Sequence, residues 1–287
     1  MSVDVVGLGT CNADFILKVP RFVCGDDEVD VQQIFTSLGG SATNFTVGIS
    51  RLDVKSGIIA RVGDDELGTW ALNNFQGEGV DVERLLLLEG STGMTFIAVD
   101  PSGERSIYSF MGANKDLKLN KDDLKYIKNS KLLHISGTYR EVADEASKHA
   151  NTLSFNPGTL LAYYGLENLS QIIKRAKFLF LNEKELYLLT KKDLELGTQA
   201  ILDLDVPYVI VTRGAEGANL YTPEEVIHYP AYQVKTADTT GAGDAFAAGF
   251  IASYIKKKDV TECMDYANYV ASECVKKFGP MNVPKIH

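Results

Sequence analysis

The sequence has few cysteines, and none of them forms a CxxC motif. Only four occur among 287 residues, and Cys11 and Cys24 lie far along the chain from Cys263 and Cys274. The latter two are separated by about three helical turns, which is too far for a disulfide between them. A disulfide framework is therefore not expected, and the thiols are predicted to be reduced in a cytoplasmic protein.

Positive charge and long apolar runs are also scarce. The net charge is −9, and the one cluster of cations, Lys256 to Lys258, is expected to end a helix, where cations complement the dipole. No apolar run approaches the roughly 20 residues that a membrane span needs, and the N-terminus lacks a signal-peptide pattern. Nucleic acid and membrane are therefore not expected as partners.

Two common nucleotide-binding motifs are missing as well. The chain has no GxxxxGK[ST] pattern, and in "GAGDAF" Phe246 stands where the dinucleotide motif GxGxxG requires its third glycine. A dinucleotide-dependent oxidoreductase is therefore disfavoured, and it would be detected by nicotinamide binding.

Short apolar runs alternate with helical stretches along most of the chain. The runs predict buried parallel strands at 3–9, 56–63, 131–137, 151–155, 177–182 and 208–214. Helices are predicted between them, for example at 41–52, 67–76 and 183–189. This alternation is typical of an α/β fold with a doubly wound, mostly parallel sheet flanked by helices.

Two regions interrupt the alternation. Residues 28–36 and the pair 94–100 and 104–110, joined by the turn "PSG", read as strands with no helix between them. They predict a small β-sheet lid of residues 15–36 and 93–111 over a core of residues 1–14, 37–92 and 112–287. An ordinary edge hairpin of the main sheet is the alternative.

The stretch "TADTTGAGDAFAAGF", residues 236–250, places glycines and a carboxylate at a predicted helix start. Unpaired N–H groups and the dipole at a helix N-terminus attract anions, and glycine lets the backbone approach them closely. Asp244 would repel a phosphate, so it is better suited to take a proton from a hydroxyl that attacks one. A glycine turn with Asp244 as a helix-start charge is the alternative.

"DTTGAGD" (238–244) resembles the C-terminal signature of the ribokinase-like (PfkB) carbohydrate kinase family. "LGGSATNFTVGISRL" (38–52) is similar to the di-glycine motif of that family, "NEKE" (182–185) to its NxxE motif and "VTRGAEGA" (211–218) to its nucleotide-binding turn. "NAD" (12–14) is expected to close the first strand, as the substrate-binding start of the family does. The resemblance extends from about Val3 to Phe278 and implies an ATP-dependent phosphotransferase with an alcohol group as acceptor.

The resemblance also implies roles for individual residues. Asp244 would be the general base, and Gly241, Ala242 and Gly243 would form an anion hole with their N–H groups. The acceptor would be bound by Asn12, Asp14, Gly39, Gly40 and Asn44. The nucleotide would be bordered by Asn182, Thr212, Gly214, Gly217, Asn268 and Ala271. Asn182 and Glu185 would hold Mg²⁺ largely through water, and K⁺ is implied near 238–244.

Several of these residues have simpler explanations. Asp14 could cap a turn, Gly39 and Gly40 could start a helix with Ser41 as its cap, and Glu185 could be a first-turn helix charge. Asn44 is a poor helix former one turn into its helix, which favours a polar task. The role of Arg213, where the family often has lysine, stays open.

The acceptor is less well defined than the reaction. "MGANK" (111–115), "LSFNPG" (153–158) and "FLFLNEKE" (178–185) resemble the archaeal nucleoside-kinase branch, in which Lys115 could meet a phosphate and Asn156 could border the phosphate channel. A nucleoside or ribose-type sugar is therefore expected, with a hexose or ketohexose kinase, or a catalytically silent regulatory homologue, as alternatives.

The predicted lid strand 94–100 is largely apolar on both registers, which favours a homodimer built on the lid. The resemblance implies the same assembly. Aspartate at Ile97 or Val99 is expected to dissociate this dimer. A monomer whose lid folds flat onto the core is the alternative.

Overall fold

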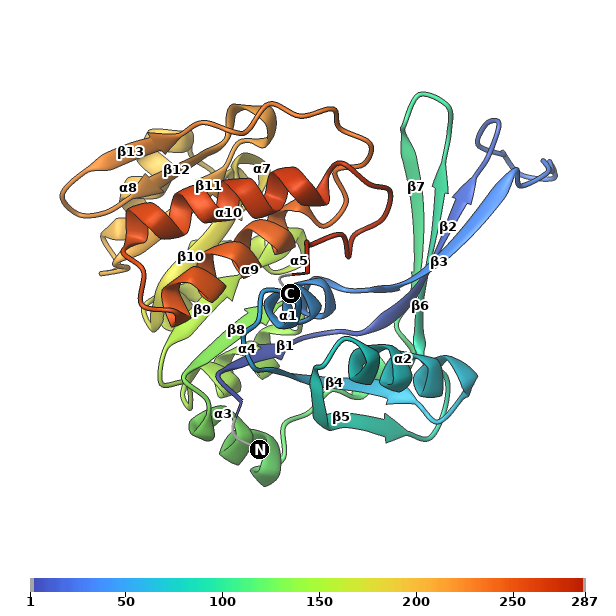
Figure 1. The fold of residues 1–287 in the computed structure, drawn as a ribbon, viewed down its shortest axis with the longest axis horizontal. Helices are drawn as coiled ribbons and strands as arrows, with labels where there is room; N and C mark the ends of the chain where they lie inside the picture. Colours follow the sequence, from blue (N-terminus) through green and yellow to red (C-terminus); the bar gives the residue numbers. More distant parts are fainter. Residues whose placement is uncertain (1–2, 286–287) are drawn as a thin grey trace.

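A nine-stranded sheet runs through the core of the computed structural model, which describes residues 3–285 (Figure 1). Its order is β13 (Val226–Tyr229), β12 (Ala218–Tyr221), β11 (Tyr208–Thr212), β10 (Ala176–Asn182), β9 (Leu153–Asn156), β8 (Leu132–Ser136), β1 (Val5–Leu8), β4 (Ser56–Gly63) and β5 (Asp81–Leu88). All pairs are parallel except those made by β12 and β13. Residues 1–2 and 286–287, the ends of the predicted core, lie outside the described residues.

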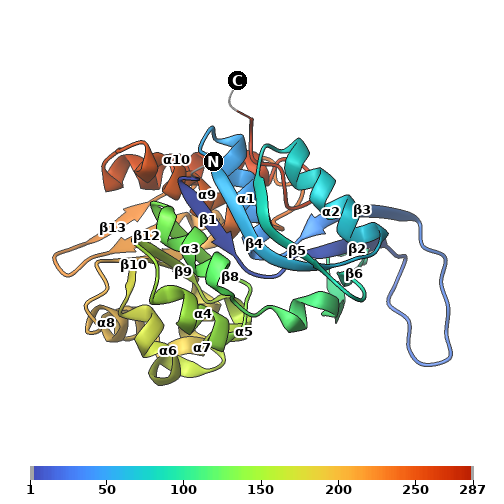
Figure 2. The ribbon, with the colours of Figure 1, turned by 90° about the horizontal axis from the view of Figure 1, so that it is seen from below.

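Helices cover both faces of this sheet, which confirms the predicted doubly wound α/β fold (Figure 2). One face carries α1 (Ser41–Arg51), α2 (Glu66–Gly77), α9 (Ala242–Ile255) and α10 (Val260–Cys274). The other carries α3 (Lys121–Asn129), α4 (Arg140–Ser147), α5 (Gly158–Ala162), α6 (Gly165–Ile173), α7 (Glu183–Thr190) and α8 (Leu194–Leu202), and short 3₁₀ turns span η1 (Gly112–Asp116) and η2 (Gly214–Glu216). Within residues 3–285, no helix has both the length and the apolar character to cross a bilayer.

The six strands predicted from apolar runs are all present. Their side chains are buried on both faces, as in β4, where all eight residues are buried. This explains the continuous apolar runs, since both sides of each strand meet helices. Strand β5 was not predicted because it opens with the charged "DVER". The short strands β12 and β13 were not predicted either.

The direction in which the sheet is built changes between β1 and β8. From β1 the chain continues to β4 and β5 on one side, and from β8 it continues through β9 and β10 on the other. In open α/β sheets, ligands bind in the crevice outside the carboxyl ends of the strands at such a switch point. The topology therefore predicts a binding crevice at the carboxyl ends of β1 and β8.

A separate four-stranded sheet projects from the core (Figure 1). We call it the lid; its order is β3 (Gln33–Gly39), β2 (Asn12–Lys18), β6 (Gly93–Val99) and β7 (Arg105–Phe110). The turn between β6 and β7 is held by Asp100, whose Oδ1 accepts hydrogen bonds from the N–H groups of Ser102 and Glu104.

Two predictions about the lid strands were wrong. The "NAD" stretch does not close the first strand of the core but opens β2, the central strand of the lid. Residues 28–32 are not a strand, because β2 ends at Lys18 and Pro20 follows, so those residues have no partner to pair with. Strand β3 begins only at Gln33, after Gln32 N–H has donated to Lys18 O.

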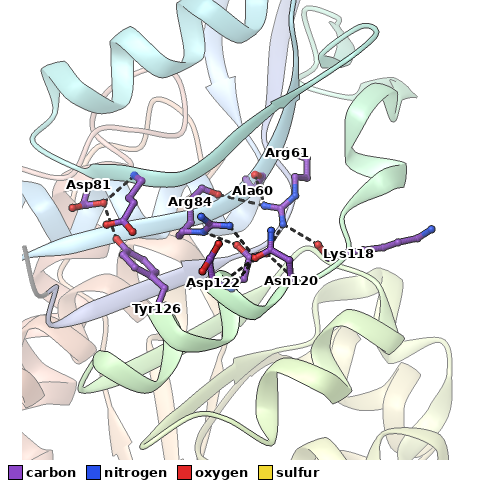
Figure 3. Close-up of polar contacts among 10 residues, drawn as sticks. Ala60, Arg61, Asp81, Arg84, Lys118, Asn120, Asp122 and Tyr126 are labelled. Carbon is purple, nitrogen blue, oxygen red and sulfur yellow. Dashed lines mark hydrogen bonds and ion pairs between the residues drawn. The ribbon is translucent and has the colours of Figure 1, made fainter.

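A buried ionic network joins β4 and β5 to α3, which lies on the face of the sheet opposite to α1 and α2 (Figure 3). Both Arg61 and Arg84 donate to the carboxylate of Asp123, which is inaccessible to solvent. Asn120 caps α3 and also accepts from Arg84 at 3.0 Å, while Tyr126 donates to Asp81 at 2.9 Å. These contacts fix α3 against the strands that carry the edge of the core.

Candidate active site

The N-terminus of α9 forms the centre of the candidate site. Gly241 is the N-cap with φ 77°, a conformation that favours glycine, and a Cβ there would lie 2.5 Å from Pro280 O. Ala242 N–H donates to Thr239 O at 3.2 Å, so this predicted anion-hole donor is partly engaged in a turn. A Cβ at Gly243 would meet no other atom within 4 Å, so the backbone at this position faces open space.

Asp244 lies in the first turn of α9, and its carboxylate faces α1. Asn44 Nδ2 donates to Asp244 Oδ2 at 2.8 Å, which joins two residues 200 positions apart in the chain. Burial raises the pKa of Asp244 to about 7, although hydrogen bonds from Asn44 and Ser41 lower it; the charge of Glu185 raises it further. The carboxylate is thus poised to exchange a proton near neutral pH.

A second carboxylate, Asp14, lies on the lid. It is 8% exposed, and its register partners on the two neighbouring strands are Ser37 and Thr95. Burial raises its pKa to about 6, with a hydrogen bond from Thr95 acting in the opposite direction. A Cβ at Gly39 would lie 2.0 Å from Asp14 Oδ2, so only glycine leaves room for this carboxylate.

The other predicted acceptor residues lie beside Asp14. Gly40 is the N-cap of α1 with φ 101°, and a Cβ there would lie 2.3 Å from Thr10 O. Asn12 Oδ1 accepts from Asn114 Nδ2 at 2.8 Å. Asn114 is itself inaccessible and also bonds the backbone of Cys11, so it fixes the start of β2.

A cavity of about 240 Å³ opens on the other side of the α9 N-terminus. Ala242 and Gly243 of the predicted anion hole line it. Five of the predicted nucleotide-binding residues also line it, namely Thr212, Gly214, Gly217, Asn268 and Ala271. Asn268 Nδ2 donates to Tyr229 O at 3.2 Å and so holds one wall of the cavity.

The NxxE motif forms a reciprocal capping box at the start of α7. Asn182 Oδ1 accepts from Glu185 N–H at 2.8 Å, and Glu185 Oε2 accepts from Asn182 N–H at 3.0 Å. This is the helix-start role named above as the simpler explanation. Burial raises the pKa of Glu185, although the hydrogen bonds with Asn182 and the charge of Lys184 act in the opposite direction.

The side chains of the NxxE motif, Asn182 and Glu185, suit a Mg²⁺ ion that is held mostly by phosphate and water. Within residues 3–285, no three His, Cys, Asp or Glu side chains gather as a metal site. Glu185 keeps one carboxylate oxygen outside the capping box. Mg²⁺ commonly binds through one or two carboxylates, water and substrate phosphates, so the residues fit the ion.

The structure gives the contacts or the exposure of three residues whose roles the sequence left open. Arg213 pairs with Glu183 at 2.8 Å and Glu216 at 2.7 Å, so it ties the turn after β11 to α7. Lys115 is exposed, and Asn156 Oδ1 accepts from Gly158 N–H at 2.9 Å at the carboxyl end of β9.

Several site residues were not predicted from the sequence. Ser41, Ser37 and Thr95 surround the two carboxylates, and Phe246 and Tyr232 line the cavity of about 240 Å³. The register of the lid strands, which places Ser37 and Thr95 beside Asp14, could not be read from the sequence because β2 was not recognised as a strand. Phe246 lies two residues after Asp244, within the stretch that the sequence had already singled out.

Known proteins are similar to this chain in sequence and in architecture. A family model described as pfkB family carbohydrate kinase matches residues 3–286. An ATP-dependent ribose-1-phosphate kinase of Halopiger xanaduensis is 33% identical over 98% of this chain and 95% of its own length. A nucleoside kinase of Methanothermobacter thermautotrophicus is 26% identical over 98% of this chain and 92% of its own length.

Solved structures agree with the sequence comparisons. A ribokinase of Thermotoga maritima superposes with a TM-score of 0.91 at 25% identity, covering 99% of this chain and 96% of that one. The nucleoside kinase of Methanocaldococcus jannaschii, described as an archaeal member of the ribokinase family, gives 0.87 at 28% identity, covering 99% and 95%. The chain belongs to the pfkB family of carbohydrate kinases and is a phosphotransferase that acts on an alcohol group.

Proposed function

We propose that the protein transfers the γ-phosphoryl group of ATP to the primary hydroxyl of a nucleoside or ribose-type sugar. The observation that carries the proposal is the position of Asp244, a carboxylate with a pKa of about 7 at the helix N-terminus that borders the nucleotide cavity. A base and a set of N–H donors at one place are what phosphoryl transfer to an alcohol requires.

In this mechanism Asp244 takes the proton of the acceptor hydroxyl. The hydroxyl oxygen forms a bond to the γ-phosphorus, the bond from that phosphorus to the β–γ bridging oxygen breaks, and ADP leaves with the electron pair. Asn44 holds the carboxylate through its 2.8 Å hydrogen bond. The N–H groups of Gly241, Ala242 and Gly243 stabilise charge on the transferred group.

The acceptor is proposed to bind between the lid and the switch-point crevice, with Asn12, Asp14, Gly39, Gly40 and Asn44 around its hydroxyls. ATP would occupy the cavity bordered by Thr212, Gly214, Gly217, Asn268 and Ala271, with Asn182 near its phosphates.

Glu185 and Asn182 would hold Mg²⁺ through water. When bound with ATP, this ion offsets the charge of the phosphate oxygens. The K⁺ implied near residues 238–244 would have to be held by backbone carbonyls, because the carboxylate of Asp238 is already engaged. Both oxygens of Asp238 already accept hydrogen bonds, from Arg105, Thr240 and Gly279.

We also propose a homodimer that forms through the outer face of the lid, in a reducing, cytoplasmic setting. Phe15 and Phe96 stack at 5.3 Å on that face, and Phe96 is 39% exposed. Exposed apolar sheet faces favour pairing with a second copy.

The proposed function is tested by ATP turnover with a panel of nucleosides, ribose, ribose 1-phosphate, hexoses and ketohexoses. Wild type should convert a ribose-containing acceptor, and Asp244→Asn should lose about 10²–10⁴-fold in kcat. Preference for a hexose would refute the acceptor class. Retention of more than about a tenth of kcat by Asp244→Asn would remove this residue from the role of base.

A further inference from the structure

Buried polar atoms without a hydrogen-bond partner concentrate around the switch-point crevice. Six of the eight such side-chain atoms found in residues 3–285 belong to lid strands β2 and β3, to α1, or to the segment that runs from the carboxyl end of β8 into the first residue of α4. They are Asp14 Oδ1, Ser37 Oγ, Asn44 Oδ1, Ser136 Oγ, Thr138 Oγ1 and Arg140 Nε. Buried polar groups are almost always paired in native proteins, so a cluster of unpaired ones indicates a missing ligand.

Three of these atoms were assigned no role above: those of Ser136, Thr138 and Arg140. They follow one another along the chain where β8 ends and α4 begins. Ser136 and Thr138 are each 1% exposed. Ser136 lies on the same face of β8 as His134, whose ring stacks on Phe45 of α1 at 3.8 Å. Ser136 therefore faces the helix that carries Asn44.

This segment lies beside Ser41, which in turn contacts the proposed base. Gly137 O accepts from Thr10 N–H at 2.8 Å, and a Cβ at Gly137 would lie 3.7 Å from the Ser41 Cβ. Ser41 in turn donates a hydrogen bond to Asp244. The crevice is thus flanked by the N-termini of two helices, α1 at Ser41 and α4 at Arg140.

The start of α4 offers donors and no neutralising cap. Its N-cap residue, Tyr139, has no side-chain capping bond, so the first-turn N–H groups are left for another acceptor. Thr138 precedes the cap, and its buried hydroxyl lies at this end of the helix. Arg140 stacks on Tyr164 at 5.6 Å, and it contacts the carboxylate of the exposed Glu141 at 3.3 Å.

A guanidinium, a hydroxyl and uncapped helix N–H groups together form a site for an oxyanion. We propose that this site binds a phosphate group of the acceptor, at the end of the acceptor opposite to the hydroxyl that is phosphorylated. The acceptor would then be a phosphorylated pentose, such as a pentose 1-phosphate, rather than a free sugar or nucleoside. This inference rests on the proposed function and narrows its substrate class.

The phosphates of ATP are a poor alternative occupant of this site. The nucleotide cavity is bordered by Thr212 at the end of β11, and β8 is three strands away from β11 in the sheet. At about 4.8 Å per strand this is roughly 14 Å. The α4 site lies at β8, next to β1, on the acceptor side of Asp244. The relative in Halopiger, named an ATP-dependent ribose-1-phosphate kinase, supports an acceptor of this chemistry within the family.

Direct binding to the full-length protein tests the inference without turnover. Calorimetry with ribose 1-phosphate, ribose, inosine and inorganic phosphate should show the tightest binding for ribose 1-phosphate. Arg140→Met should weaken its binding by about 10- to 100-fold, as loss of a charge-assisted hydrogen bond would, while ribose binding should hardly change. Arg140→Lys should recover part of the loss, and Thr138→Val should weaken binding severalfold.

Arg175→Met is the matched control. Arg175 is exposed and lies just before the amino end of β10, whereas the proposed site lies at the carboxyl ends of the strands. It should bind ribose 1-phosphate like wild type, and thermal unfolding should show that every variant is folded. Inorganic phosphate should compete with ribose 1-phosphate. If it instead binds alongside and accelerates turnover of ribose, the site is regulatory and the acceptor assignment is refuted.

The inference and the proposed function can fail separately. The anion site would be overturned if Arg140→Met bound ribose 1-phosphate with an affinity within twofold of wild type. It would also be overturned if inosine bound more tightly than ribose 1-phosphate. The kinase assignment would stand in both cases. Loss of turnover of every acceptor, with ribose 1-phosphate binding still dependent on Arg140, would refute the proposed reaction and keep the site.

Discussion

Arg105 on the lid donates to Asp238 on the core at 3.1 Å, and this ion pair connects the lid to the turn that leads into α9. The Asp238 side chain is 7% exposed and also accepts from Thr240 N–H at 2.9 Å, Thr240 Oγ1 at 2.7 Å and Gly279 N–H at 3.1 Å. These bonds lower its pKa against the effect of burial. The position of the lid is thus coupled to the backbone just before Gly241.

The first prediction concerns this coupling. Arg105→Ala should lower kcat and raise KM for the acceptor, because the lid loses its contact with the turn that positions the predicted anion hole. The expected loss in kcat/KM is about tenfold, the value of one partly exposed charge-assisted hydrogen bond. Steady-state kinetics should show a smaller change in KM for ATP, and Arg105→Lys should recover part of the loss. A variant with unchanged acceptor kinetics would leave the ion pair without a role in closure.

The second prediction is the pH dependence of the wild-type rate. A base must be ionised, so kcat/KM should rise with pH and level off above about 7, the pKa to which burial raises Asp244. Ser41→Ala removes a hydrogen bond that lowers this pKa, so the midpoint should move to higher pH. The pH profiles of wild type and Ser41→Ala measure both effects. A midpoint near the ordinary carboxylate pKa of about 4 would contradict the role of burial.

Much of the core could be predicted because its strands are buried on both faces and therefore apolar throughout. The helix start at α9 was also accessible to prediction, since Gly241, Gly243 and Asp244 stand together in one short motif. The surroundings of Asp14 and Asp244 were not, because they depend on strand register and on contacts between distant residues. The bond from Asn44 to Asp244 spans 200 positions, and no local pattern encodes it.

The third prediction separates the two roles of Glu185. Glu185→Gln keeps an oxygen for the capping bond to Asn182 N–H but removes the charge that would attract Mg²⁺. The Mg²⁺ concentration needed for half-maximal rate should rise severalfold, with little change in stability or in KM for the acceptor. The measurement is rate against Mg²⁺ at saturating ATP and acceptor. An unchanged titration would reduce Glu185 to a helix-capping residue.

The fourth prediction concerns stability. Asp123→Asn leaves the buried Arg61 and Arg84 without their shared carboxylate, and uncompensated buried charge typically costs about 3–5 kcal/mol. The free energy of unfolding in urea should fall by roughly that amount. Asp122→Asn, one residue earlier and exposed, is the control and should stay within about 0.5 kcal/mol of wild type. Equal stability of the two variants would show that the network contributes little.

The last prediction is the lid dimer, for which the first choice of test positions was wrong. Ile97 and Val99 line a cavity of about 220 Å³ between the lid and the core, together with Asp238 and Phe278. Strand residues alternate between faces, so the outward face carries their neighbour Phe96 instead.

Light scattering at micromolar concentration should give twice the chain mass of 31.4 kDa for wild type. Phe96→Asp places a charge on the exposed outward face beside Phe15 and should shift the mass toward the monomer. Leu196→Asp is the control, because Leu196 is 60% exposed on α8, which belongs to the core. It should stay dimeric. A wild-type mass near 31.4 kDa at all concentrations would favour a monomer, in which the stacked pair of Phe15 and Phe96 stays exposed to solvent.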